Sequence, residues 1–153
     1  MDELAIALQI AIKAHAGQKD KVGMDYIWHP VTVALYCRSA RGKIAALLHD
    51  VVEDTPLALA DLRAAGIGED ILAAVDRLTK RKGETVDEYY KRVAANDIAT
   101  EVKFADMRHN SDVSRFPLDR QDEAAANALK YQQRTQKLRR LTGQAPEQDG
   151  SLA

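Results

Sequence analysis

Apolar residues in this chain recur at helical spacing almost throughout, and the alternation typical of β-strands is nearly absent. Glycine, proline and capping residues divide the pattern into segments. We expect helices over residues 2–16, from Pro30 onward, and over 43–54, 58–65, 69–80, 85–93, 98–110 and 118–141. In the first of these, Leu4, Leu8, Ala11 and Ile12 are expected to face the core. The pattern predicts an all-α fold.

Length and organisation indicate one domain. The chain has 153 residues, which is enough to bury a sizeable core but leaves little room for a second one. There is no internal repeat and no linker. We therefore expect a single compact domain over residues 1–142, followed by a frayed tail over 143–153 that is rich in Gly, Gln and Pro.

Charge and cysteine content exclude several classes of protein. A net charge of −1 argues against a broadly basic nucleic-acid binder or a polybasic membrane anchor. No apolar run approaches the roughly 18 residues that a membrane helix needs. The single cysteine, Cys37, is typical of a reducing compartment. We expect a cytoplasmic protein without nucleic-acid or membrane partners, and a homodimer is compatible with such a small helical domain.

Four ionisable residues interrupt the apolar helix expected over 43–54. His49 and Glu53 are four positions apart, and so are Asp50 and Asp54. Residues at this spacing share one face of a helix. Burying unpaired carboxylates is costly, so inward-facing acids would need a cation. The alternative is a helix end whose acids face water.

Two other segments favour the cation. His29 stands immediately before Pro30, at an expected helix start, and Asp106 is embedded in an apolar helical segment. Together with His49 and Asp50 they provide nitrogen and oxygen donors for one divalent metal ion. Mixed imidazole and carboxylate donors suit manganese, iron or zinc better than calcium, and the set lacks the thiolates of structural zinc sites.

These motifs are similar to those of a known family. The chain resembles the HD-domain metal-dependent phosphohydrolases, named for an adjacent His-Asp pair. Within them it resembles the hydrolase domain of the RelA/SpoT family and its small single-domain alarmone hydrolase relatives. The matching segments are residues 14–18, 26–30, 46–55 and 102–106, with His109 and Asn110.

The resemblance implies a compact HD-domain helical fold and one divalent metal ion, usually Mn²⁺, with Fe²⁺ or Zn²⁺ possible. By position, the metal ligands would be His29, His49, Asp50 and Asp106. Glu53 and Asp54 match the acidic pair that positions and activates the attacking water. Family members remove pyrophosphate from the 3′ position of (p)ppGpp, a small phosphorylated nucleotide, and leave GDP or GTP.

The chain departs from this family at two positions. Asp20 and Asp112 stand where alarmone hydrolases tend to have arginine. These acids motivate an alternative function, an HD phosphatase that acts on another nucleotide or on a phosphorylated cofactor. A third hypothesis is a non-catalytic nucleotide-sensing module. The presence of Glu53 and Asp54 argues against it, because a sensor does not need to activate water.

Phosphate binding requires cations or amides near the acidic centre. We expect Lys19 and Lys21, in the loop before His29, to bind substrate, together with Lys103 and Asn110 in the segment around Asp106. The alternative for each lysine is an ordinary solvated surface position.

Three other features have structural interpretations. His15 is expected to hydrogen-bond the loop that carries His29. His109 either orients a metal ligand or caps a helix end. The basic residues of the last expected helix are attributed to the helix dipole, which favours cations near a helix C-terminus. These residues are Lys130, Arg134, Lys137, Arg139 and Arg140.

Overall fold

The computed structural model describes residues 1–144 and confirms the all-α expectation. Within that range there is no β-strand, and a single isolated bridge pairs Lys19 with Asp25. The α-helices are α1 (Glu3–Ala14), α2 (Trp28–Tyr36), α3 (Ala40–Leu48), α4 (Val51–Asp54), α5 (Leu59–Ala64), α6 (Glu69–Leu78), α7 (Val86–Ala94), α8 (Asp97–Asn110) and α9 (Gln121–Thr142). Two short 3₁₀ turns, η1 (Val113–Arg115) and η2 (Leu118–Arg120), connect α8 to α9.

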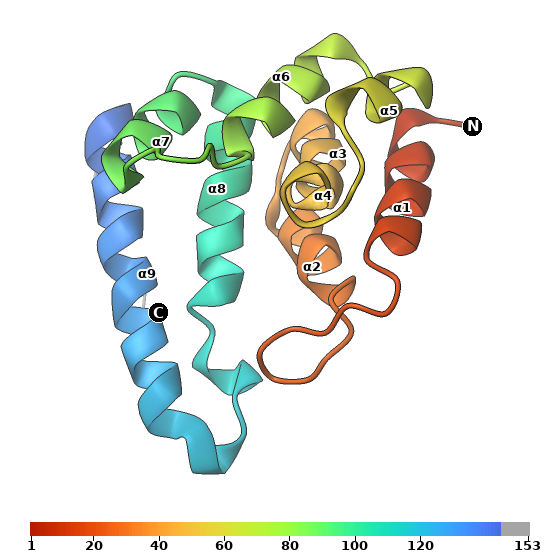
Figure 1. Cartoon of the computed structure of the whole chain (residues 1–153). Coiled ribbons are helices and arrows are strands. Elements are labelled where there is room, and N and C mark those ends of the chain that lie inside the picture. The colour runs from red at the N-terminus through yellow and green to blue at the C-terminus, as the bar shows by residue number, and fades with distance from the viewer. Residues whose placement is uncertain (145–153) are drawn as a thin grey trace.

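The helices are arranged in layers around α8. Helices α2 and α3 pack on one side of α8, and α9 packs on the other (Figure 1). Helix α1 lies outside α3, and α6 contacts α3, α7 and α8. The core is therefore a continuous set of apolar side chains between these layers, and includes Leu48, Val51, Ile71, Val102 and Met107.

Helix α1 presents a different face to the core from the one the sequence predicted. Ala11 is fully buried as expected, but Leu4, Leu8 and Ile12 are 43%, 38% and 51% exposed, and Ala7 is buried instead. The two alanines are small enough for the α1 backbone to pack closely on α3. The prediction for the three larger side chains was wrong because it gave weight to size rather than to the closeness of helix packing.

The helix expected over 43–54 is interrupted at His49 and Asp50. Helix α3 ends at Leu48 and the short α4 begins at Val51. At the break the amide of His49 bonds the carbonyl of Ala46 at 3.4 Å, in a three-residue rather than a four-residue step. The expectation of one continuous helix was therefore wrong. The break places His49 and Asp50 at a corner of the chain.

The last helix also differs slightly from the prediction, because residues 118–120 form a 3₁₀ turn and α9 begins at Gln121. It ends where Gly143 adopts a left-handed conformation with φ of 70°, which glycine accommodates without a Cβ clash. The division between a domain over 1–142 and a tail stays a prediction, since residues 145–153 lie outside the described residues. Among residues 1–144, the helices are too short or too polar to span a bilayer.

Candidate active site

The four expected metal ligands come together from three parts of the chain. His29 lies in the first turn of α2, His49 and Asp50 lie at the corner between α3 and α4, and Asp106 lies on α8. The His29 Nε2 atom is 2.9 Å from Asp106 Oδ1 and 3.7 Å from Asp50 Oδ2. The His49 Nε2 atom is 3.0 Å from Asp50 Oδ2 and 3.5 Å from Asp106 Oδ1. Two imidazoles and two carboxylates thus lie close together, and donor atoms of His29, His49 and Asp50 all lie within 4.8 Å of one another.

A second histidine fixes the orientation of His29. The Nδ1 atoms of His29 and His109 are 2.7 Å apart, and their rings are stacked. Burial lowers the pKa of His109 to about 4, so its ring is neutral and can accept a hydrogen bond. This arrangement directs the His29 Nε2 atom toward the acids. Of the two roles considered for His109, this contact favours the orienting one.

The tautomer of His49 follows from its backbone contact. Its Nδ1 atom lies 2.5 Å from the carbonyl oxygen of Ala46 and must carry the proton that this bond needs. The buried Nε2 atom has no hydrogen-bond partner, although two carboxylates are close. A neutral ring protonated at Nδ1 has its lone pair on Nε2, where a metal ion can accept it.

Hydrogen-bond donors hold both acids in position. The Tyr26 hydroxyl donates to Asp50 Oδ2 at 2.5 Å. Lys103 Nζ donates to Asp106 Oδ2 at 2.8 Å, and Asn110 Nδ2 donates to Asp106 Oδ1 at 3.0 Å. Burial disfavours the charge on Asp106, but the Lys103 ammonium outweighs burial and holds the Asp106 pKa well below its usual range. The charge of His49 likewise outweighs burial and lowers the pKa of Asp50, so both carboxylates are anionic.

The donor set fits a divalent cation. Burial opposes protonation of His49, yet the Asp50 and Asp106 carboxylates outweigh it and raise the His49 pKa well above its usual value. A position that favours a buried proton so strongly has the negative potential that also favours a metal ion. Two nitrogens and two oxygens suit first-row transition metals, whereas calcium takes about 6–8 oxygen ligands.

Glu53 and Asp54 lie beside this cluster on α4. Ligand atoms of Asp50, Glu53 and Asp54 all lie within 4.8 Å of one another. Burial, followed by the charges of Asp50 and Glu53, raises the pKa of Asp54 to about 6. Glu53 Oε1 accepts a 2.7 Å bond from the amide of Lys80, which ties it to the segment after α6. A carboxyl group that titrates near neutrality is suited to general acid–base chemistry.

A hollow of about 200 Å³ surrounds the cluster. Lys103 and Asn110 line it, but both are bonded to Asp106 rather than directed only at the hollow. Lys19 and Lys21 are not among the lining residues: Lys19 pairs with Asp25, and Lys21 donates to Asn127 at 2.7 Å. Substrate binding by these four residues stays a prediction.

Six residues that line this hollow were not among the predicted site residues. They are Tyr26, Leu78, Lys80, Tyr89, Tyr131 and Arg134. The signal available for Arg134 was its position well before the end of α9, where the helix dipole gives little reason for a cation. For Tyr26, only its place three residues before His29 could have indicated a role.

The acids that depart from the family pattern have structural partners. Asp20 accepts bonds from the amides of Val22 and Met24 and pairs with Arg115. Asp112 accepts a bond from the amide of Ser114 at the start of η1.

His15 bonds Gln18 at 2.9 Å, as expected for a residue that supports the loop before His29.

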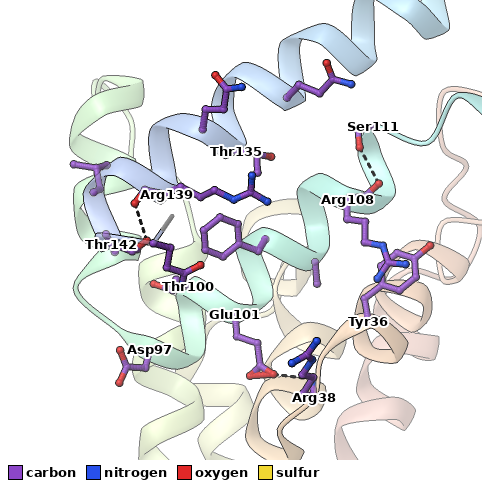
Figure 2. A pocket seen from close by; sticks show the side chains of 17 residues that line it. Tyr36, Arg38, Asp97, Thr100, Glu101, Arg108, Ser111, Thr135, Arg139 and Thr142 are labelled. Carbon is purple, nitrogen blue, oxygen red and sulfur yellow. Dashed lines mark hydrogen bonds between the residues drawn. The ribbon is translucent and has the colours of Figure 1, made fainter. Parts of the chain in front are cut away.

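A larger hollow of about 990 Å³ lies between α8 and the C-terminal half of α9 (Figure 2). Arg108 stacks on the Tyr36 ring there, 3.9 Å from its centroid, and Glu101 bonds the amides of Arg38 and Ser39. None of the four metal-ligand candidates is among its lining residues. The larger hollow is therefore separate from the His–Asp cluster.

The fold and the cluster define a helical protein built around a His–Asp centre of metal-binding type. A model of the HD domain matches residues 7–153, and the chain belongs to the HD-domain family. A guanosine-3′,5′-bis(diphosphate) 3′-pyrophosphohydrolase of Borreliella burgdorferi is 31% identical over 80% of this chain and 21% of its own length. The bifunctional (p)ppGpp synthase/hydrolase SpoT of Escherichia coli is 35% identical over 68% of this chain and 17% of its own length.

The chain thus spans about a fifth of the length of these curated relatives. A solved structure agrees in fold over nearly the whole chain. It is a metazoan ortholog of SpoT that hydrolyzes ppGpp, with a TM-score of 0.64, 23% sequence identity, and coverage of 95% of this chain and 98% of that protein. This likeness confirms the compact HD-type helical fold.

Proposed function

We propose that this protein is a metal-dependent phosphohydrolase that removes pyrophosphate from the 3′ position of (p)ppGpp. The observation that carries the proposal is the convergence of His29, His49, Asp50 and Asp106 beside two further acids. The named activities of the relatives from Borreliella burgdorferi and Escherichia coli support the choice of substrate.

In the proposed reaction, water attacks the phosphorus bonded to the ribose 3′ oxygen. The bond between this phosphorus and the 3′ oxygen breaks, and pyrophosphate and GDP or GTP are formed. When bound to the four ligands, a divalent cation lowers the pKa of water and offsets charge on a phosphoryl oxygen. Asp54 accepts the proton of the attacking water, and the ribose 3′ oxygen takes up a proton as it leaves and becomes the 3′ hydroxyl of the product. Glu53, held by the amide of Lys80, orients the water.

We also propose the identity of the metal ion, the cellular location and the partners of the protein. Mn²⁺ is the proposed ion, with Fe²⁺ and Zn²⁺ as alternatives, because the donors are two imidazoles and two carboxylates. We further propose a cytoplasmic protein with a small phosphorylated nucleotide as its partner, without nucleic-acid or membrane partners, and with homodimer formation to be measured by light scattering.

The test is a pyrophosphate-release assay. The purified chain, stripped with EDTA and reloaded with Mn²⁺, is expected to convert ppGpp to GDP and pyrophosphate, and His49→Ala is expected to abolish the conversion. Arg108→Ala is a matched control, because Arg108 is exposed on α8 and lines the other hollow. Unchanged ppGpp with the wild-type chain at saturating metal overturns the proposal.

A second candidate is an HD phosphatase for another phosphorylated nucleotide or cofactor. It is favoured by the acids at positions 20 and 112, and by the placement of Lys19 and Lys21 away from the hollow lining. A screen of phosphorylated metabolites with Mn²⁺, in which phosphate and pyrophosphate are measured separately, distinguishes the two. Release of phosphate alone from another substrate supports this candidate. Tight nucleotide binding without any product supports the sensing module.

A further inference from the structure

The outer face of α1 carries a row of large apolar side chains. Leu4, Leu8 and Ile12 are 43%, 38% and 51% exposed. They are spaced four residues apart, so they lie one helical turn above another. Helix α1 lies at the edge of the molecule and packs its opposite, alanine-bearing face against α3 (Figure 1). The three side chains therefore form one continuous apolar row that points away from the core.

Such a row indicates a contact surface. Single exposed apolar residues are common on soluble proteins, whereas contiguous apolar patches mark interaction sites. From Leu4 to Ile12 the row extends over about 12 Å of helix, at 1.5 Å per residue. A strip that is only one side chain wide fits the apolar side of a single partner helix.

Opposite charges flank the two ends of this row. Asp2 is the N-cap of α1 and Lys13 lies in its last turn, and both are exposed. The two positions are separated by about three whole turns, so both charges lie along the same side of the row. The Asp2 side chain accepts a 2.8 Å bond from the amide of Ala5 and still has acceptor sites left. No ion pair within 4.0 Å joins Lys13 to an acid among residues 1–144.

This arrangement is self-complementary in an antiparallel pair of α1 helices. With a two-fold axis at Leu8, a residue before Leu8 lies level with the residue equally far after Leu8 in the other copy. Leu8 then meets Leu8, and Leu4 meets Ile12. Asp2 of each copy comes close to Lys13 of the other, and this pair occurs twice. A two-fold contact uses the same patch on both copies, as closed homodimers do.

A membrane surface fits this face less well. Helices that lie on membranes carry many lysines and arginines on their polar side. In α1 and its N-cap, Lys13 is the single cation, and Asp2 and Glu3 form an acidic end. A second copy of the chain matches both the apolar row and its flanking charges.

We propose that the apolar row on α1 is an interface between two copies of this chain, packed as an antiparallel helix pair centred on Leu8. The contact is small, because α1 is about 18 Å long, and stable interfaces bury about 800 Å² on each partner. The dimer is therefore weak, with a Kd of roughly 10–200 µM. The proposal is independent of the reaction, since α1 supplies none of the residues that line the hollow around the His–Asp cluster.

Sedimentation equilibrium of the full chain, at concentrations up to about 500 µM, tests for this dimer. Leu8→Glu places two carboxylates against each other at the axis, and is expected to raise the Kd more than about tenfold. The matched control is Leu35→Glu, at a leucine on α2 that is 73% exposed, and it is expected to leave the Kd unchanged. A wild-type chain that stays monomeric throughout overturns the proposal, and so does an unchanged Kd in Leu8→Glu.

Cysteine cross-linking tests the register and does not depend on the folding of Leu8→Glu. Cys37 is the one native cysteine and is 3% exposed, so it does not compete with an introduced thiol. Oxidation with copper phenanthroline is expected to link Leu8→Cys into a disulfide dimer, because the two thiols meet at the axis. Leu4→Cys is expected to stay unlinked, since its two copies lie about 12 Å apart along the pair. Linking of Leu4→Cys, or no linking of Leu8→Cys, overturns the antiparallel pair.

A double-mutant cycle tests the flanking charges. Asp2→Asn keeps the helix cap but removes the charge, and Lys13→Gln removes its partner. Each change is expected to raise the Kd about two- to tenfold, as for exposed ion pairs that occur twice in the dimer. The double variant is expected to be no weaker than the weaker single variant, whereas fully additive effects exclude the pairing of Asp2 with Lys13.

Discussion

The imidazoles of His29 and His109 share one proton across the contact between α2 and α8. Their Nδ1 atoms are 2.7 Å apart, so one ring must donate and the other must accept. The low pKa of His109, caused by burial, keeps that ring neutral. When His29 binds a metal ion through Nε2, its own proton is on Nδ1 and His109 Nδ1 accepts it. The His29 Nε2 atom then has its lone pair directed at the metal-binding centre.

Replacement of His109 is expected to weaken metal binding. In His109→Leu the acceptor is lost, His29 can rotate or change tautomer, and the affinity for Mn²⁺ is expected to fall about 10- to 100-fold. In His109→Gln the side-chain oxygen can accept the same hydrogen bond, so this variant is expected to recover most of the affinity. Isothermal titration with Mn²⁺ measures both. Equal affinity in His109→Leu and the wild-type chain would contradict this role.

Divalent metal is expected to stabilise the fold. The cluster brings Asp50 and Asp106 together in the core, and a cation that binds only the folded chain adds about 2.7 kcal/mol at a concentration 100 times its Kd. For a domain of this size that corresponds to a rise in Tm of roughly 5–10 °C. Thermal unfolding with Mn²⁺ and with EDTA measures the rise, and His49→Ala is expected to abolish it. A rise that persists in His49→Ala would place the ion elsewhere.

The rate of hydrolysis is expected to decline at acidic pH. A general base must be deprotonated, and the pKa of Asp54 is raised to about 6 by burial and by the charges of Asp50 and Glu53. At saturating metal, kcat is therefore expected to be constant above this pH and to fall about tenfold per unit below it.

Substitutions at Asp54 and Glu53 distinguish the roles proposed for these two carboxylates. Asp54→Asn is expected to lower kcat about 10²–10⁴-fold and to remove the acidic decline. Glu53→Gln is expected to have the smaller effect, because its amide oxygen can still accept the bond from Lys80. An acidic decline that persists in Asp54→Asn would assign the proton to another group.

A contact far from the metal ligands is expected to limit substitution at Gly42. A Cβ at this position would lie 2.3 Å from Glu101 Oε2 and 2.8 Å from Ser39 Oγ. Glu101 accepts bonds from the amides of Arg38 and Ser39 at the start of α3, so moving it breaks those bonds. Gly42→Ala is expected to destabilise the fold by about 1–3 kcal/mol in urea unfolding. In a Glu101→Ala background the same change is expected to cost less, and equal costs would exclude the clash.

The helical fold was predictable because apolar spacing and cap residues are local properties. Asp2, Ser39 and Thr85 each accept a bond from a backbone amide at the start of a helix. The break at His49 and the inward face of α1 were not predictable, because they depend on what packs against each segment. Ala7 and Ala11 are buried only because α1 lies directly against α3.

The convergence of His29, His49, Asp50 and Asp106 was expected from their residue types and from the family resemblance, and the distances confirm that they meet. The sequence did not predict correctly which lysines and arginines line the hollow around this cluster. Lys21 precedes His29 by only eight positions but bonds Asn127, whereas Arg134 is distant in sequence and lines the hollow. A lysine or arginine has a long, flexible side chain, so its position in the sequence says little about which surface its charge reaches.

Helix α9 contributes Tyr131 and Arg134 to the hollow, while all four metal-ligand candidates precede it in the chain. This last helix therefore adds wall to the hollow without supplying any of the four candidate ligands. Exchanging Tyr131 or Arg134 would change the shape and charge of that wall while the His–Asp cluster keeps its donor atoms.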